Sequence, residues 1–190
     1  MNDTLNNIKV WPGLIVSVCS SGLLPRMIRA SLGRSYSKIT GYPAVKCPTH
    51  TAMIIEYRGR LCIGESVYPF SKLTSFDEYE KDIESKRRWN LQLFEVAEVS
   101  REDQGRASDW WVDNVMGHPY DWPAYGRLAL KALFGDICKK ASGLEWAHWC
   151  TEGVMLAYLR TDNDWANNLN PTPVTVIKRW HDGVLRCVAT

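Results

Sequence analysis

Alternation of hydrophobic and polar positions predicts short strands in the first half of the chain. Residues 10–18 contain a Pro-Gly turn followed by a β-branched run and predict the first strand. Two more strand candidates, 49–57 and 61–66, are separated by an Arg58-Gly59 turn, a pattern typical of a β-hairpin. Residues 91–99 alternate again and predict a further strand.

Apolar positions at helical spacing lie mainly between and after these strands. The helices that this spacing predicts cover residues 23–32, 101–116 and 124–140 and a stretch that includes Cys150. Residues 71–88 predict an exposed helix or a long excursion, and residues 33–48, with several Gly and Pro, predict a loop. The end of the chain is predicted to form a surface loop, a helical turn and a last strand, at residues 163–173, 174–180 and 184–188. Since no repeat, low-complexity tract or linker interrupts this pattern, we expect one α+β domain over residues 1–190.

Composition and charge exclude several classes of function. The 190 residues are 45% hydrophobic and 23% charged, which is typical of a globular domain. The net charge is +2 and no basic-aromatic patch stands out, so we expect no nucleic acid partner; Lys86-Arg87-Arg88 is interpreted as a solvated helix end. The absence of a signal-peptide pattern and of a spanning apolar run predicts a cytoplasmic protein, with release by lysis or a partner left open.

Six cysteines are present, and none forms a C-x-x-C pair, so reduced thiols are the expectation. Metal ligands at short spacing, such as H-E-x-x-H, are not found, and neither is a glycine-rich nucleotide loop. We therefore expect no metal and no cofactor.

Cys150 is a candidate nucleophile. It opens an apolar stretch in which Gly153, Val154 and Ala157 share its helical face. The first turn of a helix favours a thiolate through the helix dipole and unpaired N–H groups. Two alternatives stay open: a buried structural cysteine, and a helix that begins earlier, at a capping box starting with Ser142.

The hairpin supplies a candidate base and a group to orient it. If Arg58-Gly59 is a two-residue loop, Ala52 faces Glu65, and His50 lies on the same face of the sheet. His50 and Glu65 are then diagonal neighbours about 7–8 Å apart at the backbone, within side-chain reach. A three-residue loop would separate them.

Five short motifs occur in an order that is known from one family, with the histidine before the cysteine. They are Thr49-His50-Thr51-Ala52, Glu65-Ser66, Gly117-His118-Pro119-Tyr120-Asp121, Trp149-Cys150-Thr151-Glu152-Gly153-Val154 and Thr172-Pro173. On these motifs the chain resembles a circularly permuted NlpC/P60 cysteine hydrolase of the papain-like superfamily, and most closely the YiiX/YebB-like group.

The resemblance implies a papain-like fold in permuted order, with an antiparallel, small barrel-like sheet packed against helices and the nucleophile at the N-terminal end of a helix. It implies Cys150 as nucleophile, His50 as base and Glu65 as the third residue. The implied reaction is cleavage of an amide bond in a peptide or peptidoglycan-type substrate through an acyl-enzyme. A lipid or ester hydrolase or acyltransferase on the same fold, and a non-catalytic binding module, remain alternatives.

Three further residues are candidates for substrate binding. Tyr120 could donate to the oxyanion or form a wall of the groove, and Trp149 could line it. Asp121 is the third, although it could instead cap the next helix, just as Tyr120 could simply pack the helix connection.

Overall fold

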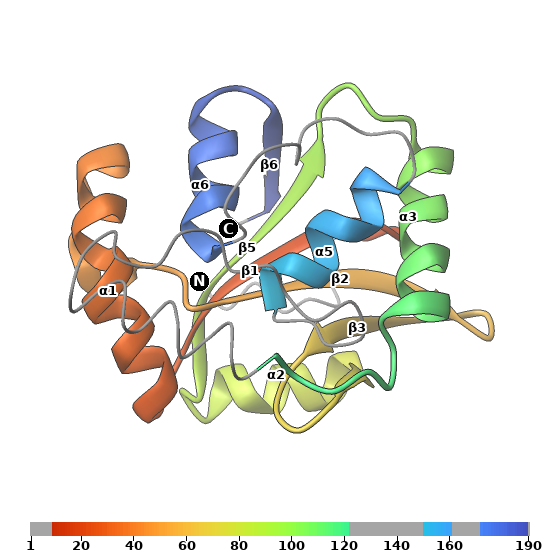
Figure 1. Cartoon of the computed structure of the whole chain (residues 1–190), viewed down its shortest axis with the longest axis horizontal. Coiled ribbons are helices and arrows are strands. Elements are labelled where there is room, and N and C mark those ends of the chain that lie inside the picture. The colour runs from red at the N-terminus through yellow and green to blue at the C-terminus, as the bar shows by residue number, and fades with distance from the viewer. Residues whose placement is uncertain (1–8, 122–149, 161–171, 190) are drawn as a thin grey trace.

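The structure, a computed structural model, describes residues 9–121, 150–160 and 172–189 (Figure 1). Its strands are β1 (Ile15–Ser20), β2 (His50–Tyr57), β3 (Arg60–Ser66), β4 (Ser71–Thr74), β5 (Arg88–Val96) and β6 (Leu185–Ala189). Its helices are α1 (Leu23–Thr40), α2 (Phe76–Glu84), α3 (Arg101–Asn114), α5 (Cys150–Leu159) and α6 (Pro173–His181), with a short 3₁₀ helix η2 (Ala44–Lys46). The predicted α+β class is confirmed.

The strands form one antiparallel sheet in the order β4-β3-β2-β1-β5-β6. The predicted hairpin register is confirmed, since Tyr57 pairs with Arg60 and Met53 pairs with Gly64. Arg58 and Gly59 both have positive φ, as a two-residue turn between twisted strands requires. Within the described residues β4 and β6 are the two edges of the sheet, which is therefore open there and not closed into the expected small barrel.

Alternate residues of the strands build two apolar layers, one on each face of the sheet. One layer contains α2, whose Tyr79 packs against Leu14, Val16, Ala52, Ile54, Ile63 and Leu93. The other layer contains α3, α5 and α6, with Trp111, Val154 and Ile177 packed around Ile15, Met53, Ile55 and Phe94. Helices thus cover both faces of the sheet, and α1 flanks it at one side (Figure 1).

The loop predicted for residues 33–48 is wrong in its first half, because α1 continues to Thr40. Gly33, which suggested a break, is a packing position inside the helix, where a Cβ would come within 2.7 Å of the Ala44 Cβ. The helix ends at Gly41, whose φ of 73° is the left-handed conformation common after a helix.

Residues 71–88 are not one exposed helix but contain β4, α2 and the first residue of β5. Ser75 caps α2 by accepting a hydrogen bond from the Glu78 N–H. The helix expected at 124–140 and nearly all of the loop expected at 163–173 lie outside the described residues, and Pro173 is already the first residue of α6. None of the helices in the described ranges is long and apolar enough to cross a membrane.

Candidate active site

His50 and Glu65 meet at the end of the hairpin opposite the turn. Cross-strand pairing of β2 with β3 runs from Tyr57 to Met53, and the two residues lie just beyond its last pair. Because the side chains share one face, the His50 Nε2 comes within 2.9 Å of the Glu65 Oε2. Glu65 is 1% exposed and His50 9%, so their interaction is shielded from water. The expected proximity of the two side chains is thus found.

The Glu65 carboxylate accepts hydrogen bonds from three sides. Besides His50, Thr74 donates to Oε1 at 2.6 Å, and both terminal nitrogens of Arg88 donate, at 2.8 and 3.2 Å. Burial acts to raise the pKa of Glu65, but the hydrogen bond and charge of His50 and the charge of Arg88 hold it well below its ordinary range. Glu65 is therefore an ionised carboxylate inside the protein.

Arg88 was missed by the sequence reasoning, which placed it in a solvated helix end. Its side chain is only 13% exposed, and the guanidinium lies over the Tyr79 ring, 4.1 Å from the centroid. The Arg88 Nε also donates to Asp82 of α2 at 3.1 Å. Arg88 thus joins Glu65 to α2 through a two-pronged, charge-assisted contact, the strongest kind of side-chain hydrogen bonding.

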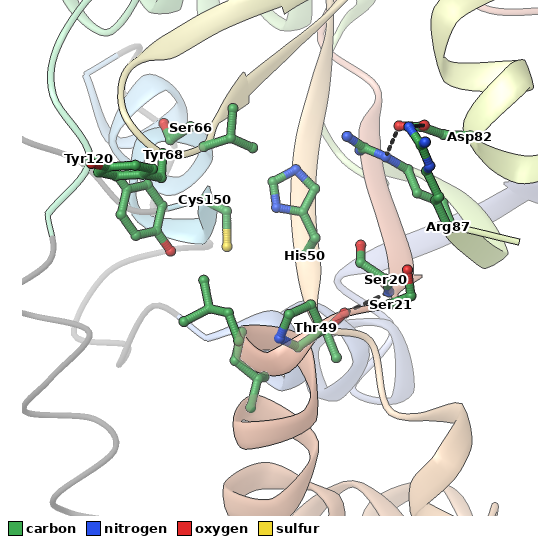
Figure 2. Close-up of a pocket in the computed structure, with 15 residues that line it drawn as sticks. Ser20, Ser21, Thr49, His50, Ser66, Tyr68, Asp82, Arg87, Tyr120 and Cys150 are labelled. Carbon is green, nitrogen blue, oxygen red and sulfur yellow. Dashed lines mark hydrogen bonds and ion pairs between the residues drawn. The ribbon is translucent and has the colours of Figure 1, made fainter. Parts of the chain in front are cut away.

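Cys150 approaches the His50 ring from the other face of the sheet. It is the first described residue of α5, and the turn that it begins is held on β2 by a hydrogen bond from the Thr151 hydroxyl to that of Thr51, at 3.1 Å. In Figure 2 its sulfur lies beside the edge of the His50 ring that carries Nδ1, while Nε2 is bound to Glu65. Whether the helix begins at Cys150 or at the earlier capping box lies outside the described residues.

The charges of the site favour an ion pair between sulfur and imidazole. Burial would raise the pKa of the Cys150 thiol, but the hydrogen bond and positive charge of His50, the Thr51 backbone and the Thr151 hydroxyl lower it. Burial likewise lowers the pKa of His50, but interactions with Cys150 and Glu65 outweigh it and raise the pKa to about 9. Thiolate and imidazolium therefore stabilise each other.

Cys19, Cys47 and Cys187 differ from Cys150 in the direction of their pKa shifts. Burial raises the pKa of Cys19 to about 11 and that of Cys47 to about 12, and it also raises the pKa of Cys187. The thiol pKa of Cys150 is lowered instead. This contrast separates a reactive thiol from buried structural ones.

A pocket of about 400 Å³ opens over Cys150 and His50. Its apolar wall comes from α1 and from the segment after β3; the apolar residues are Leu24, Pro25, Ile28, Val67 and Tyr68. Tyr120 lines the same pocket and also packs against Ile28 of α1. Asp121 is fully buried and is not among the residues that line this pocket. Trp149 lies outside the described residues.

The described residues hold no candidate metal centre. They contain no group of three or more His, Cys, Asp and Glu side chains that could hold a metal ion. The donor sets that bind transition metals in proteins usually need at least three such ligands. The described residues therefore offer no such ligand set.

Comparison with known proteins gives a likeness of fold. No protein-family model matches the chain, and no curated protein sequence matches it. A solved structure that does match is the metalloprotein YiiX (DUF1105) from Escherichia coli O157:H7, with a TM-score of 0.61 and 15% sequence identity. The match covers 95% of this chain and 97% of the YiiX chain. The protein therefore has a YiiX-like fold.

Proposed function

We propose that the protein is a cysteine hydrolase that cleaves an amide bond through Cys150, His50 and Glu65. The observation that carries this proposal is the geometry of His50. One ring nitrogen is bound to a buried carboxylate at 2.9 Å, and the opposite edge of the ring faces a cysteine at an open pocket. A thiol, a base and an orienting group in this order are the set that nucleophilic acyl transfer requires.

The steps follow from these positions. The Cys150 thiolate adds to the substrate carbonyl carbon, and the tetrahedral adduct collapses as the C–N bond breaks. The leaving amine takes its proton from the His50 imidazolium. Neutral His50 then removes a proton from water, the hydroxide adds to the thioester, and breakage of the C–S bond releases the acid and restores the thiolate–imidazolium pair.

Glu65 and Arg88 have supporting roles in this scheme. Glu65 holds the His50 ring with Nδ1 toward Cys150 and stabilises the imidazolium. Arg88 keeps Glu65 ionised, so that the proton stays on His50. The Cys150 backbone N–H is the proposed donor to the oxyanion, and Tyr120 forms a wall of the pocket near the same sulfur.

The fold assignment of this proposal is the permuted NlpC/P60 arrangement of the papain-like superfamily, as one domain. The YiiX-like fold and the histidine-before-cysteine order support it. A peptide or peptidoglycan-type substrate is the leading choice. An ester or acyl-transfer substrate is the second candidate, because Leu24, Pro25, Ile28 and Val67 give the pocket an apolar wall that suits an acyl chain.

The test has two parts. Iodoacetamide at mildly acidic pH should label Cys150 before the other cysteines, as read by mass spectrometry of peptides. Turnover of peptidoglycan fragments and of acyl esters is then compared for wild type, Cys150→Ala and Cys62→Ala, the last being a control at a half-buried cysteine.

Loss of turnover in Cys150→Ala, with wild-type rates in Cys62→Ala, supports the hydrolase, and the substrate that is turned over decides between amide and ester. Equal labelling of all cysteines would contradict a thiolate at Cys150. Absence of turnover of both substrates by wild type would favour the non-catalytic binding module.

A further inference from the structure

The charge of this chain is strongly divided along the sequence. Residues 4–55 contain six Lys and Arg and no Asp or Glu. The rest of the chain holds the other 17 Lys and Arg against all 21 Asp and Glu, so the net charge of +2 hides a basic segment on an acidic remainder. Such an asymmetry is a basis for attraction to an anionic partner, whatever the total charge.

The basic segment reaches the surface along one stripe of α1 and the turn that follows it. Exposed positions recur at three- and four-residue steps on the helix, and η2 extends the surface. We call this surface the α1 face; it consists of Leu23, Arg26, Met27, Ala30, Arg34, Lys38, Tyr42, Val45 and Lys46. Within the described part of the chain, its four cations make no ion pair. Arg29, which is half-buried over Trp89, is not part of it.

Exposed hydrophobic side chains are concentrated on the same face. Of the six large hydrophobic residues that are exposed in the described ranges, four belong to it, and Leu23 and Val45 are 77% and 62% exposed. The other two are Tyr68 and Phe70, after β3. Leu24, Pro25 and Ile28 of α1 and Tyr68 line the pocket over Cys150, so the start of α1, where Leu23 and Met27 are exposed, lies beside the pocket.

We propose that the α1 face docks the protein on a lipid bilayer that carries anionic headgroups, with the mouth of the Cys150 pocket at the membrane surface. Unpaired cations attract such a surface, and interspersed aliphatic side chains insert below the headgroups. Exposed Leu, Met and Val side chains favour a bilayer over nucleic acid, on which they cannot stack. The docking does not depend on whether Cys150 is catalytic, so the two proposals can fail separately.

The experiment is co-sedimentation of the full chain with vesicles of phosphatidylcholine alone or mixed with phosphatidylglycerol, at physiological salt. Wild type is expected to bind the mixed vesicles and not the neutral ones. Arg34→Gln/Lys38→Gln should weaken binding about thirty-fold, because each basic residue lost at an anionic surface costs roughly a factor of five. Leu23→Gln/Met27→Gln should weaken it about tenfold or more, through the loss of inserted apolar area.

The matched control is Arg58→Gln/Arg60→Gln, which removes two exposed cations from the β2–β3 turn, at the far end of the molecule from α1 (Figure 1). It should bind as wild type does, and equal unfolding temperatures of the variants show that folding is unaffected. Failure of wild type to bind the mixed vesicles, or equal binding to neutral ones, would overturn the proposal. So would equal losses in the control and in Arg34→Gln/Lys38→Gln, or wild-type binding by Leu23→Gln/Met27→Gln.

Discussion

Replacing Glu65 by glutamine removes one negative charge from the buried side of His50 while keeping nearly the same volume. The pKa of His50 is raised from 6.5 to about 9, and burial acts against this rise. Such a shift corresponds to a stabilisation of the imidazolium on the order of 3 kcal/mol. Glu65 supplies one of the two interactions that raise it, the other being with Cys150, so its loss should cost the imidazolium roughly 2–3 kcal/mol.

The thiolate of Cys150 depends on that imidazolium, so its pKa should rise when Glu65 is replaced. The assay is the rate of iodoacetamide alkylation of Cys150 as a function of pH, read by mass spectrometry of the Cys150 peptide. Wild type should react at a nearly constant rate from mildly acidic pH upward. In Glu65→Gln the midpoint should move to higher pH, and the rate at about pH 6 should fall roughly 30- to 100-fold.

The matched control is Glu56→Gln, the same change at an exposed position of β2. It should leave the alkylation profile unchanged. If glutamine at position 65 prevents folding, the Glu65→Gln/Arg88→Met variant removes both charges of the buried pair and tests the same point. A folded variant with the wild-type midpoint would refute the conclusion that Glu65 stabilises the ion pair.

Three further outcomes are expected. Arg88→Met should lower the free energy of unfolding by about 3–5 kcal/mol in urea titrations, because it leaves the buried Glu65 carboxylate short of a partner. Arg88→Lys should recover part of the loss. Equal stability of wild type and Arg88→Met would contradict this expectation. Because the pKa of Glu65 is lowered, its stabilising contribution is present above pH about 4.5 and is lost as the pH falls. Wild type should therefore lose more stability on acidification than Glu65→Gln. Parallel curves of unfolding free energy against pH would argue against a depressed pKa. Gly64→Ala should destabilise the fold by about 1–3 kcal/mol, because its Cβ would lie 2.5 Å from the Ile55 Cγ1 and 2.9 Å from a ring carbon of Trp111. A melting temperature equal to that of wild type would show that both side chains can move aside.

The hairpin shows how far the sequence pattern can be taken. The β-branched run before Arg58-Gly59 and the alternation after it predicted two strands, and the two-residue loop fixed which side chains face each other. Because the parity of a strand is a local property, the placement of His50 and Glu65 on one face needed no knowledge of the rest of the fold. The register and the 2.9 Å contact agree with that prediction.

The length of α1 could not be obtained in the same way. Gly33 is a poor helix residue on its own, and the prediction therefore ended the helix before it. The structure keeps the helix because Ala44, which comes after the turn, packs where a side chain at position 33 would be. This contact joins residues from two different elements, so the sequence around Gly33 carries no sign of it.

Arg88 is the clearest case in which local pattern and structure diverge. Strict alternation along β5 places Arg88 on the face of Gln92, away from Leu93 and from the sheet face that holds Glu65. The pairing of β5 with β1 shifts by one residue between Gln92 and Trp89, where Asn90 has a φ of 53°. As a result Leu93 pairs with Val16 but Arg88 pairs with Ser20. One extra residue in a strand reverses the faces beyond it, and Arg88 is thereby turned toward Glu65. The bulge accordingly explains why the buried carboxylate has an arginine partner. Deleting Asn90 would remove the extra residue and leave four regular steps between Leu93 and Arg88, so Arg88 should stay on the Glu65 face and its ion pair with Glu65 should persist.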